Sequence, residues 1–335
     1  MRKLISLCVA AILIAGCLSA CSFGKNGADN GKLKIVTTIF PEYDWIREIL
    51  GDRAADAEIT LLLDNGVDLH SYQPTAADIL KISECDLFVY VGGESDGWVE
   101  NALRSSANKD RVVVNLLEAL GSAAKEEELL PGMQEEEHDH DHEDGEDHDH
   151  EHEEEGPEYD EHVWLSLRNA EILVKSLADA LTKADSANAE TYKKNAEAYI
   201  AKLKTLDEQY KKTVSEAPVK TLLFGDRFPF RYFADDYGLT CYAAFSGCSA
   251  ESEASFETIA FLSQKVDELS LHTVMTIEGT DHRIADTIIR NTNTKDQKIL
   301  TLNSLQSATS ADIKNGVTYL SVMEQNLSVL KEALR

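Results

Sequence analysis

The stretch KLKIVTTIFPEYDWIREIL, residues 32–50, carries the pattern that decides the fold. Its first part, residues 32–40, is apolar and rich in β-branched residues, and Pro41 ends it, so we predict a buried strand. Its second part, residues 42–50, has apolar residues at helical spacing, which indicates an amphipathic helix. A strand followed directly by a helix is the building unit of an α/β protein.

The same unit recurs on both sides of the middle of the chain. In the first half, strands are predicted at 59–64, 86–92 and 111–117, with helices at 75–84 and 98–105. After Pro218 the alternation starts again, and further strands are predicted at 220–226, 241–245, 273–279 and 297–302. Strands that alternate with helices predict parallel sheets, and hence two α/β lobes.

A long helical segment separates the two lobes. Residues 169–217 are predicted to be helical, and the part from 186 to 216 alone would be about 45 Å long at 1.5 Å per residue. A helix of that length is expected to connect two lobes. We therefore expect two Rossmann-like α/β lobes, at residues 33–168 and 218–335, joined by a long spine helix within 169–217.

The N-terminus indicates export and a lipid anchor. Arg2 and Lys3 precede an apolar run that ends at Ala20 with small residues, the pattern of a signal peptide over residues 1–20. The sequence LSAC, residues 18–21, resembles the bacterial lipobox, in which the cysteine is lipidated. A plain cleavage signal beside a chance cysteine is the alternative. Residues 21–32 would then form a polar tether on the extracytoplasmic face of the cell membrane.

Three cysteines remain after the tether, namely Cys85, Cys241 and Cys248. An odd number in an oxidising compartment allows at most one disulfide. Cys241 and Cys248 are close enough in sequence to pair, and the sequence leaves that question open. The repeated CxxC spacing of a cysteine-type zinc site is absent.

The acidic composition of the chain argues against a nucleic-acid partner. The chain of 335 residues is 43 % hydrophobic, which is normal for a globular protein, and its formal net charge is −28. Because binding to nucleic-acid phosphates needs a basic surface, no nucleic-acid partner is expected.

Much of the acidity lies in EEEHDHDHEDGEDHDHEHEEE, residues 135–155. This segment belongs to a loop predicted at about 121–160, and it is too polar to fold by itself. Alternating imidazoles and carboxylates would bind Zn²⁺ loosely at several sites, and a solvated spacer is the alternative. The six histidines are His138, His140, His142, His148, His150 and His152.

Two histidines outside this segment lie in motifs. His70 stands in GVDLHSYQPTAADI, after a predicted strand and before a predicted helix, which is the edge of a parallel sheet where ligands bind. His162 stands in DEHVWLSLRNA, where the regular pattern resumes. Either residue, taken alone, could be an ordinary surface histidine.

Together these motifs resemble the metal-specific solute-binding proteins of zinc and manganese ABC transporters. The likeness covers nearly the whole chain after the signal peptide, including KIVTTIFPEYDW, the histidine-rich insert, the long helix and YFADDYGL. The resemblance implies a metal site in the cleft between the two lobes, with His70 and His162 as the first two ligands.

For the other ligands the resemblance leaves alternatives open. The family has a His or Glu on the strand that leads to the helix ending at YGL, where this chain offers Asp226, and a helix N-cap is the alternative role. A family acidic segment matches Asp281, with Glu278 and His282 as alternatives. The remaining histidine, His272, is expected to be a surface residue.

The expected ligand chemistry fits more than one metal. Zn²⁺ favours four ligands and accepts imidazole nitrogen and carboxylate oxygen, but two histidines with two carboxylates also suit Mn²⁺. The histidine-rich loop favours zinc, because the resembling zinc proteins carry a similar loop. The resemblance then implies a monomer that captures Zn²⁺, with Mn²⁺ as the alternative, and delivers it to an ABC permease and its ATPase.

The same residues leave two alternative functions. A surface metallohydrolase could use two histidines and a carboxylate with a metal-bound water, but the chain has no HExxH or GxSxG motif, so no enzyme is expected. A surface metal buffer or adhesin without a transporter is the second alternative.

Overall fold

The computed structural model describes residues 31–104, 107–133, 158–249 and 253–335. The predicted signal peptide, Cys21 and the six histidines of residues 135–155 lie outside these ranges. Residues Leu33–Arg335 form one compact unit. Within the described residues, no helix is both long enough and apolar enough to cross a membrane.

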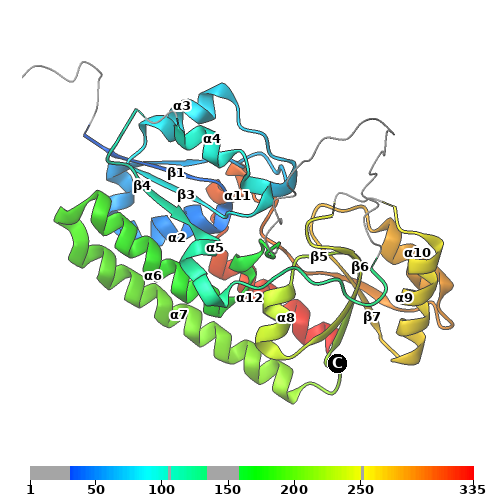
Figure 1. The fold of residues 1–335 in the computed structure, drawn as a ribbon. Coiled ribbons are helices and arrows are strands. Elements are labelled where there is room, and N and C mark those ends of the chain that lie inside the picture. Colours follow the sequence, from blue (N-terminus) through cyan, green and yellow to red (C-terminus); the bar gives the residue numbers. More distant parts are fainter. Residues whose placement is uncertain (1–30, 105–106, 134–157, 250–252) are drawn as a thin grey trace, which may run out of the picture. The chain divides into compact units, whose positions relative to one another are not determined.

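The first lobe is built on a parallel sheet of four strands in the order β2-β1-β3-β4. The opening stretch of the sequence forms its central strand β1 and the helix α2, as predicted (Figure 1). The predicted strand at 111–117 is shorter, because helix α5 begins at Leu116. The elements are β1 Leu33–Thr37, α2 Phe40–Leu50, β2 Ala57–Leu61, α3 Ala76–Glu84, β3 Leu87–Tyr90, α4 Val99–Arg104, β4 Val112–Asn115 and α5 Leu116–Leu120.

The second lobe repeats this topology with strand order β6-β5-β7-β8, again parallel. In each sheet the first strand is central, and the next two strands lie on either side of it. The short helix α11 was not predicted. The elements are β5 Thr221–Phe228, α8 Arg231–Tyr237, β6 Thr240–Ser246, α9 Phe256–Glu268, β7 Thr273–Thr276, α10 Arg283–Asn291, β8 Lys298–Thr301, α11 Ser310–Lys314 and α12 Tyr319–Ala333.

Two helices link the sheets: α6 Leu167–Ala184 and α7 Ala189–Glu216. The predicted helical segment is therefore interrupted near Asp185. With 28 residues, α7 is about 42 Å long at 1.5 Å per residue. Asn195 on α7 donates a hydrogen bond to the carbonyl oxygen of Ile49 in the first lobe. Asp207, further along α7, accepts one from the hydroxyl of Tyr237 in the second, so this helix contacts both lobes, as expected of a spine.

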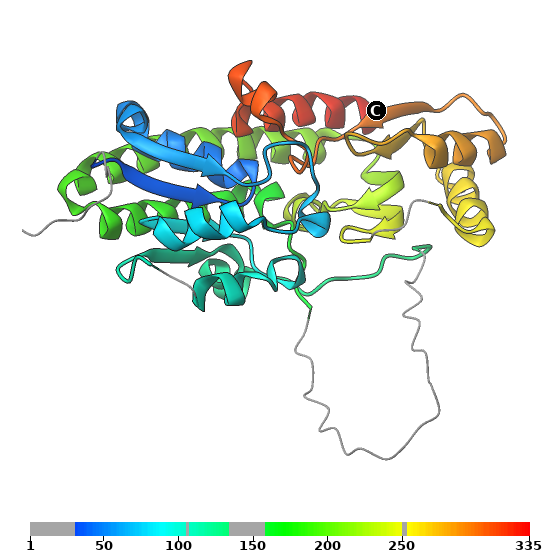
Figure 2. The same cartoon turned by 90° about the horizontal axis from the view of Figure 1, so that it is seen from above.

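One apolar core extends through both lobes. It includes side chains from β1 and β3, from α6 and α7, and from β5, α8 and α12. A second, smaller core lies under α9 and α10 in the second lobe. Helix α12 packs against α7 and α2, and its last turn reaches the second lobe, where Glu332 forms an ion pair with Lys298 of β8 (Figure 2). The shared core makes large relative movement of the two sheets costly, because movement would expose buried apolar surface.

The segment Asp160–Ser166 is buried at the centre of this arrangement. The indole nitrogen of Trp164 donates to the carbonyl oxygen of Ser304 (2.8 Å), and the carbonyl oxygen of Trp164 accepts from the hydroxyl of Tyr319 (2.6 Å). The backbone N–H of Tyr319 in turn donates to Asp44 on α2 (2.9 Å). These bonds fix the chain beside Trp164 to residues from both ends of the sequence.

Asp44 provides a test of this packing. Burial raises the pKa of its carboxyl group from 3.8 to about 6, so its contribution to the free energy of unfolding declines as pH rises towards 6 and the buried group ionises. Asparagine keeps an acceptor for Tyr319 and cannot ionise. We expect the stability of Asp44→Asn relative to wild type to improve by roughly 2.4 kcal/mol between pH 4 and pH 7.

Urea unfolding at the two pH values measures this difference. Asp52→Asn, at an exposed position in the same lobe, is the matched control. An equal shift for the two substitutions would show that the burial of Asp44 is not its cause.

Candidate metal centre

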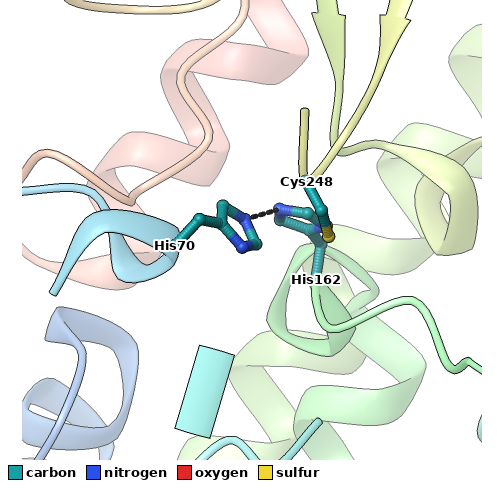
Figure 3. Close-up of side chains that lie close together, drawn as sticks. All are labelled: His70, His162 and Cys248. Atoms are coloured by element: carbon teal, nitrogen blue, oxygen red, sulfur yellow. Dashed lines mark hydrogen bonds between the residues drawn. The ribbon is translucent and has the colours of Figure 1, made fainter. Parts of the chain in front are cut away.

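Two histidines that lie 92 residues apart in the sequence meet at the junction of the lobes. His70 is in the short 3₁₀ turn Leu69–Ser71 that follows β2, and the side chain of Asp68 caps this turn by accepting from the backbone N–H of His70. His162 directly precedes the 3₁₀ turn Val163–Leu165. Their Nε2 atoms are 3.2 Å apart (Figure 3).

Hydrogen bonds at the other nitrogen of each ring orient the pair. Nδ1 of His70 lies 2.7 Å from the hydroxyl of Ser95 and 3.5 Å from a carboxylate oxygen of Glu161. Nδ1 of His162 lies 3.1 Å from a carboxylate oxygen of Asp160. Acceptors at Nδ1 hold a proton there and leave the Nε2 lone pair free, which is how proteins prepare histidine for a metal ion.

The surroundings keep His70 uncharged. Burial, followed by the neighbouring His162, lowers the pKa of His70 to about 3. His162 has no exposed surface. Burial also raises the pKa of Glu161. A neutral imidazole is the form that binds metals, so the pair is ready to accept a cation at neutral pH.

The separation of the Nε2 atoms suits a shared ion. In a tetrahedral zinc site with Zn–N bonds of about 2.0–2.1 Å, two ligand nitrogens are separated by roughly 3.3–3.4 Å. The two Nε2 atoms lie 3.2 Å apart. Without an ion, a proton on one Nε2 atom can bridge the two ring nitrogens at this distance, and a bound metal ion would take the place of that proton.

Cys248 completes a cluster that the sequence analysis missed. Its Sγ and the ligand nitrogens of His70 and His162 all lie within 4.8 Å of one another (Figure 3). In the described part of the chain, this is the only group of three or more His, Cys, Asp and Glu side chains with that property. Cys248 follows strand β6 by two residues, and that position at the carboxyl end of a strand was the available signal.

The thiol of Cys248 is free, as are those of Cys85 and Cys241. The sequence alone did not decide whether Cys241 and Cys248 form a disulfide, and in this structure they do not.

The two predicted carboxylate ligands lie outside this cluster. Asp226, near the end of β5, accepts hydrogen bonds from the backbone of Ile277 (3.1 Å) and the hydroxyl of Thr280 (2.9 Å). It is not the N-cap of α8, which is Phe230. Asp281 is exposed and forms an ion pair with Arg283. A ligand role for Asp226 or Asp281 stays a prediction from the resemblance.

The alternative ligands Glu278 and His282 also lie outside the cluster of His70, His162 and Cys248. Glu278 accepts hydrogen bonds from the backbone and hydroxyl of Ser304 (2.6 and 2.8 Å). His282 precedes α10 with a left-handed backbone (φ 58°). His272 is exposed, as predicted for a surface residue.

Polar residues from the second lobe reach the first lobe beside the pair. The guanidinium of Arg227 donates to Asp68 Oδ2 at 2.7 Å. When the amide of Gln306 is oriented to donate to Asp68, its oxygen accepts a hydrogen bond from Nε2 of His162 at 2.9 Å. These contacts place the positive charge of Arg227 next to Asp68 and the amide of Gln306 next to Nε2 of His162.

Comparison with known proteins assigns a family. The family described as "Zinc-uptake complex component A periplasmic", ZnuA, matches residues 35–333. The chain belongs to the ZnuA family. It is 37 % identical over 330 residues to the zinc-binding lipoprotein AdcA of Streptococcus pneumoniae, covering 98 % of this chain and 61 % of AdcA. It is 33 % identical over 323 residues to the high-affinity zinc uptake system protein ZnuA of Bacillus subtilis, covering 96 % and 94 %.

Solved structures confirm the fold of this ZnuA-family chain. The Zn(II)-bound ZnuA-like domain of S. pneumoniae AdcA matches with a TM-score of 0.68 and 32 % identity, over 91 % of this chain and 99 % of that domain. The metal-dependent lipoprotein YcdH of B. subtilis matches with a TM-score of 0.71 and 30 % identity, over 90 % and 99 %. Two parallel-sheet lobes and a long helix are thus the family architecture, while the chain spans about three-fifths of AdcA.

The hydrogen bond from Ser95 to His70 leads to a prediction. Ser95→Ala removes the 2.7 Å partner of Nδ1 and frees the ring to turn, so we expect zinc affinity to fall by roughly 10-fold or more, as for other residues that orient a ligand. Competition with a chromophoric chelator measures the affinity. Ser71→Ala, an exposed serine next to His70, is the matched control and should leave the affinity unchanged. Equal affinities for the two variants would show that Ser95 does not orient His70.

Proposed function

We propose that this ZnuA-family chain captures Zn²⁺ on the extracytoplasmic face of the membrane and delivers it to an ABC permease and its ATPase for uptake. The observation that carries the proposal is the pair of Nε2 atoms 3.2 Å apart, each on a ring whose Nδ1 is already engaged. The names of the relatives, which describe zinc binding and zinc uptake, support the same metal.

The architecture suggests how the ion is held and passed on. His70 and His162 both belong to the first lobe, and the turn at Gly247 in the second lobe packs against the ring of His162, so the ion would bind where the two lobes meet. Because the lobes share one apolar core, we expect only a slight tightening on binding. The permease then contacts both lobes and receives the ion, with the chain acting as a monomer.

The location and the accessory loop belong to the proposal as well. A lipid on Cys21 would hold the protein at the membrane. The six histidines of residues 135–155 would gather zinc or sense its abundance. Both features lie outside the described residues. The described ends of this loop pair with each other, since Glu126 and Tyr159 form an antiparallel bridge, and Asp160 beside His162 donates its backbone N–H to the carbonyl oxygen of Lys125. The described ends of the loop therefore lie beside the segment that carries His162.

The proposal includes no catalytic role. The contacts around the pair orient ligands, and capture needs no general base. Assays of metal-dependent hydrolysis with generic esters and peptides are expected to show no turnover.

A histidine substitution tests the site. His70→Ala removes one of the two convergent nitrogens, so we expect tight zinc binding to be lost, with an increase in Kd of 100-fold or more, on the order of the contribution of a direct ligand. His272→Ala, which removes an exposed histidine, is the matched control. Calorimetric titration compares the two variants, and similar losses in both would contradict the assignment of His70.

Deletion of residues 135–155 separates the transport site from the loop. We expect the shortened protein to retain one tight ion per chain, because His70 and His162 are kept. Mass spectrometry of the purified protein after exposure to equal zinc and manganese gives the stoichiometry and the preferred metal. Loss of all tight binding would place the site in the loop, and a preference for manganese would favour the alternative metal.

A further inference from the structure

We propose that Cys248 supplies a third protein ligand to the captured ion, so that the site is a His₂Cys zinc centre assembled from both lobes. This inference rests on the proposed function, because it assigns a further ligand and a metal class to the same site.

The distances allow this ligation with a small adjustment. Sγ and the two histidine nitrogens all lie within 4.8 Å of one another. In a tetrahedral site with Zn–S of about 2.3 Å and Zn–N of about 2.0–2.1 Å, sulfur and nitrogen are separated by roughly 3.6 Å. Cys248 would therefore have to approach by about 1 Å at most. It lies in the turn after β6, where such a shift does not disturb the pairing of strands.

The turn that carries Cys248 is packed directly against His162. A Cβ atom on Gly247 would lie 2.7 Å from Cε1 and 3.0 Å from Nδ1 of His162, and 3.1 Å from the carbonyl oxygen of Phe228. Only a glycine lets the backbone approach the ring this closely. The absence of a side chain at position 247 thus brings the next residue, Cys248, to the metal-binding edge of the histidine pair.

The environment of the sulfur differs from that of the other two thiols. Cys85 and Cys241 are buried in the apolar core, whereas Cys248 is partly exposed. Burial, followed by the carboxylate of Glu161, raises the pKa of the Cys248 thiol, while a hydrogen bond with the backbone of Glu161 lowers it. Binding exchanges one proton for the ion: the S–H bond breaks, the Zn–S bond forms, and the proton leaves to solvent. No oxidant or reductant is required.

A thiolate decides between the two candidate metals. Sulfur ligands favour Zn²⁺, whereas Mn²⁺ prefers oxygen ligands. Two neutral imidazoles and one thiolate leave a single positive charge on the ion. The carboxylates of Asp160 and Glu161 lie behind the two rings, bonded to or close to their Nδ1 atoms, and are placed to balance that charge. The site is therefore expected to reject manganese.

Cobalt substitution tests the thiolate without any mutation. We expect the full-length protein with one equivalent of Co²⁺ to show a near-ultraviolet thiolate-to-cobalt charge-transfer band, together with the visible bands of tetrahedral cobalt. Residues 135–155 contain no cysteine, so ions bound there cannot produce the charge-transfer band. Its absence from wild-type protein that binds one Zn²⁺ tightly would overturn the inference and leave the proposed function intact. Absence of any tight zinc site would instead overturn the proposed function.

Matched variants assign the sulfur. Cys248→Ser should abolish the charge-transfer band and weaken zinc binding by roughly 100-fold, at the upper end of the effect of residues that only orient a ligand. Cys241→Ser, on the same strand β6, should keep both. Cys248→His should recover zinc affinity without the band, because it restores a ligand but no sulfur. Retention of the band in Cys248→Ser, or unchanged affinity in that variant, would contradict the assignment.

Discussion

The hydrogen bonds that fix Trp164 are the constraint on which the site depends. Its indole N–H reaches Ser304, and its carbonyl oxygen accepts from Tyr319, so a segment in the middle of the chain is held by residues near its C-terminus. His162 stands two positions earlier and is fully buried. Asp160 and Glu161, the two residues before it, provide the carboxylates that face the Nδ1 atoms of both histidines. Three consecutive residues therefore set the orientation of the whole histidine pair.

The duplicated topology explains how ligands from distant parts of the sequence converge. Each lobe has a central first strand, followed by the strand beside it, β2 in one lobe and β6 in the other. His70 comes from the connection after β2, and Cys248 from the turn after β6. In a parallel sheet these connections leave from the carboxyl edge. The two lobes thus direct equivalent edges towards each other, and each edge contributes one side chain to the cluster.

Much of the fold could be predicted from the sequence, because hydrophobic periodicity reports which residues are buried in strands and helices. The alternation of elements, the long helix and the positions of His70 and His162 followed from such local patterns and from the motifs that resemble a known family. Cys248 could not be predicted in this way. Its closeness to His162 results from packing across 86 positions of sequence and from the glycine before it, and no periodic pattern encodes such a contact. Asp226 illustrates the opposite case: it was predicted as the nearest donor to a family position whose His or Glu is absent here, while its carboxylate is bonded within its own lobe.

The apolar core shared by the lobes has a consequence for the kinetics of transport. A preorganised site needs little reorganisation to bind an ion. The same rigidity makes spontaneous dissociation slow, because each metal–ligand bond must break without help from a movement of the lobes. Escape of the ion would then be rate-limiting for each round of delivery unless a docked partner lowers the barrier. Within the cluster, the turn after β6 lies outside the strand pairing, so it can move without breaking a hydrogen bond between strands. Withdrawal of one side chain there would reduce the coordination number while both sheets remain intact.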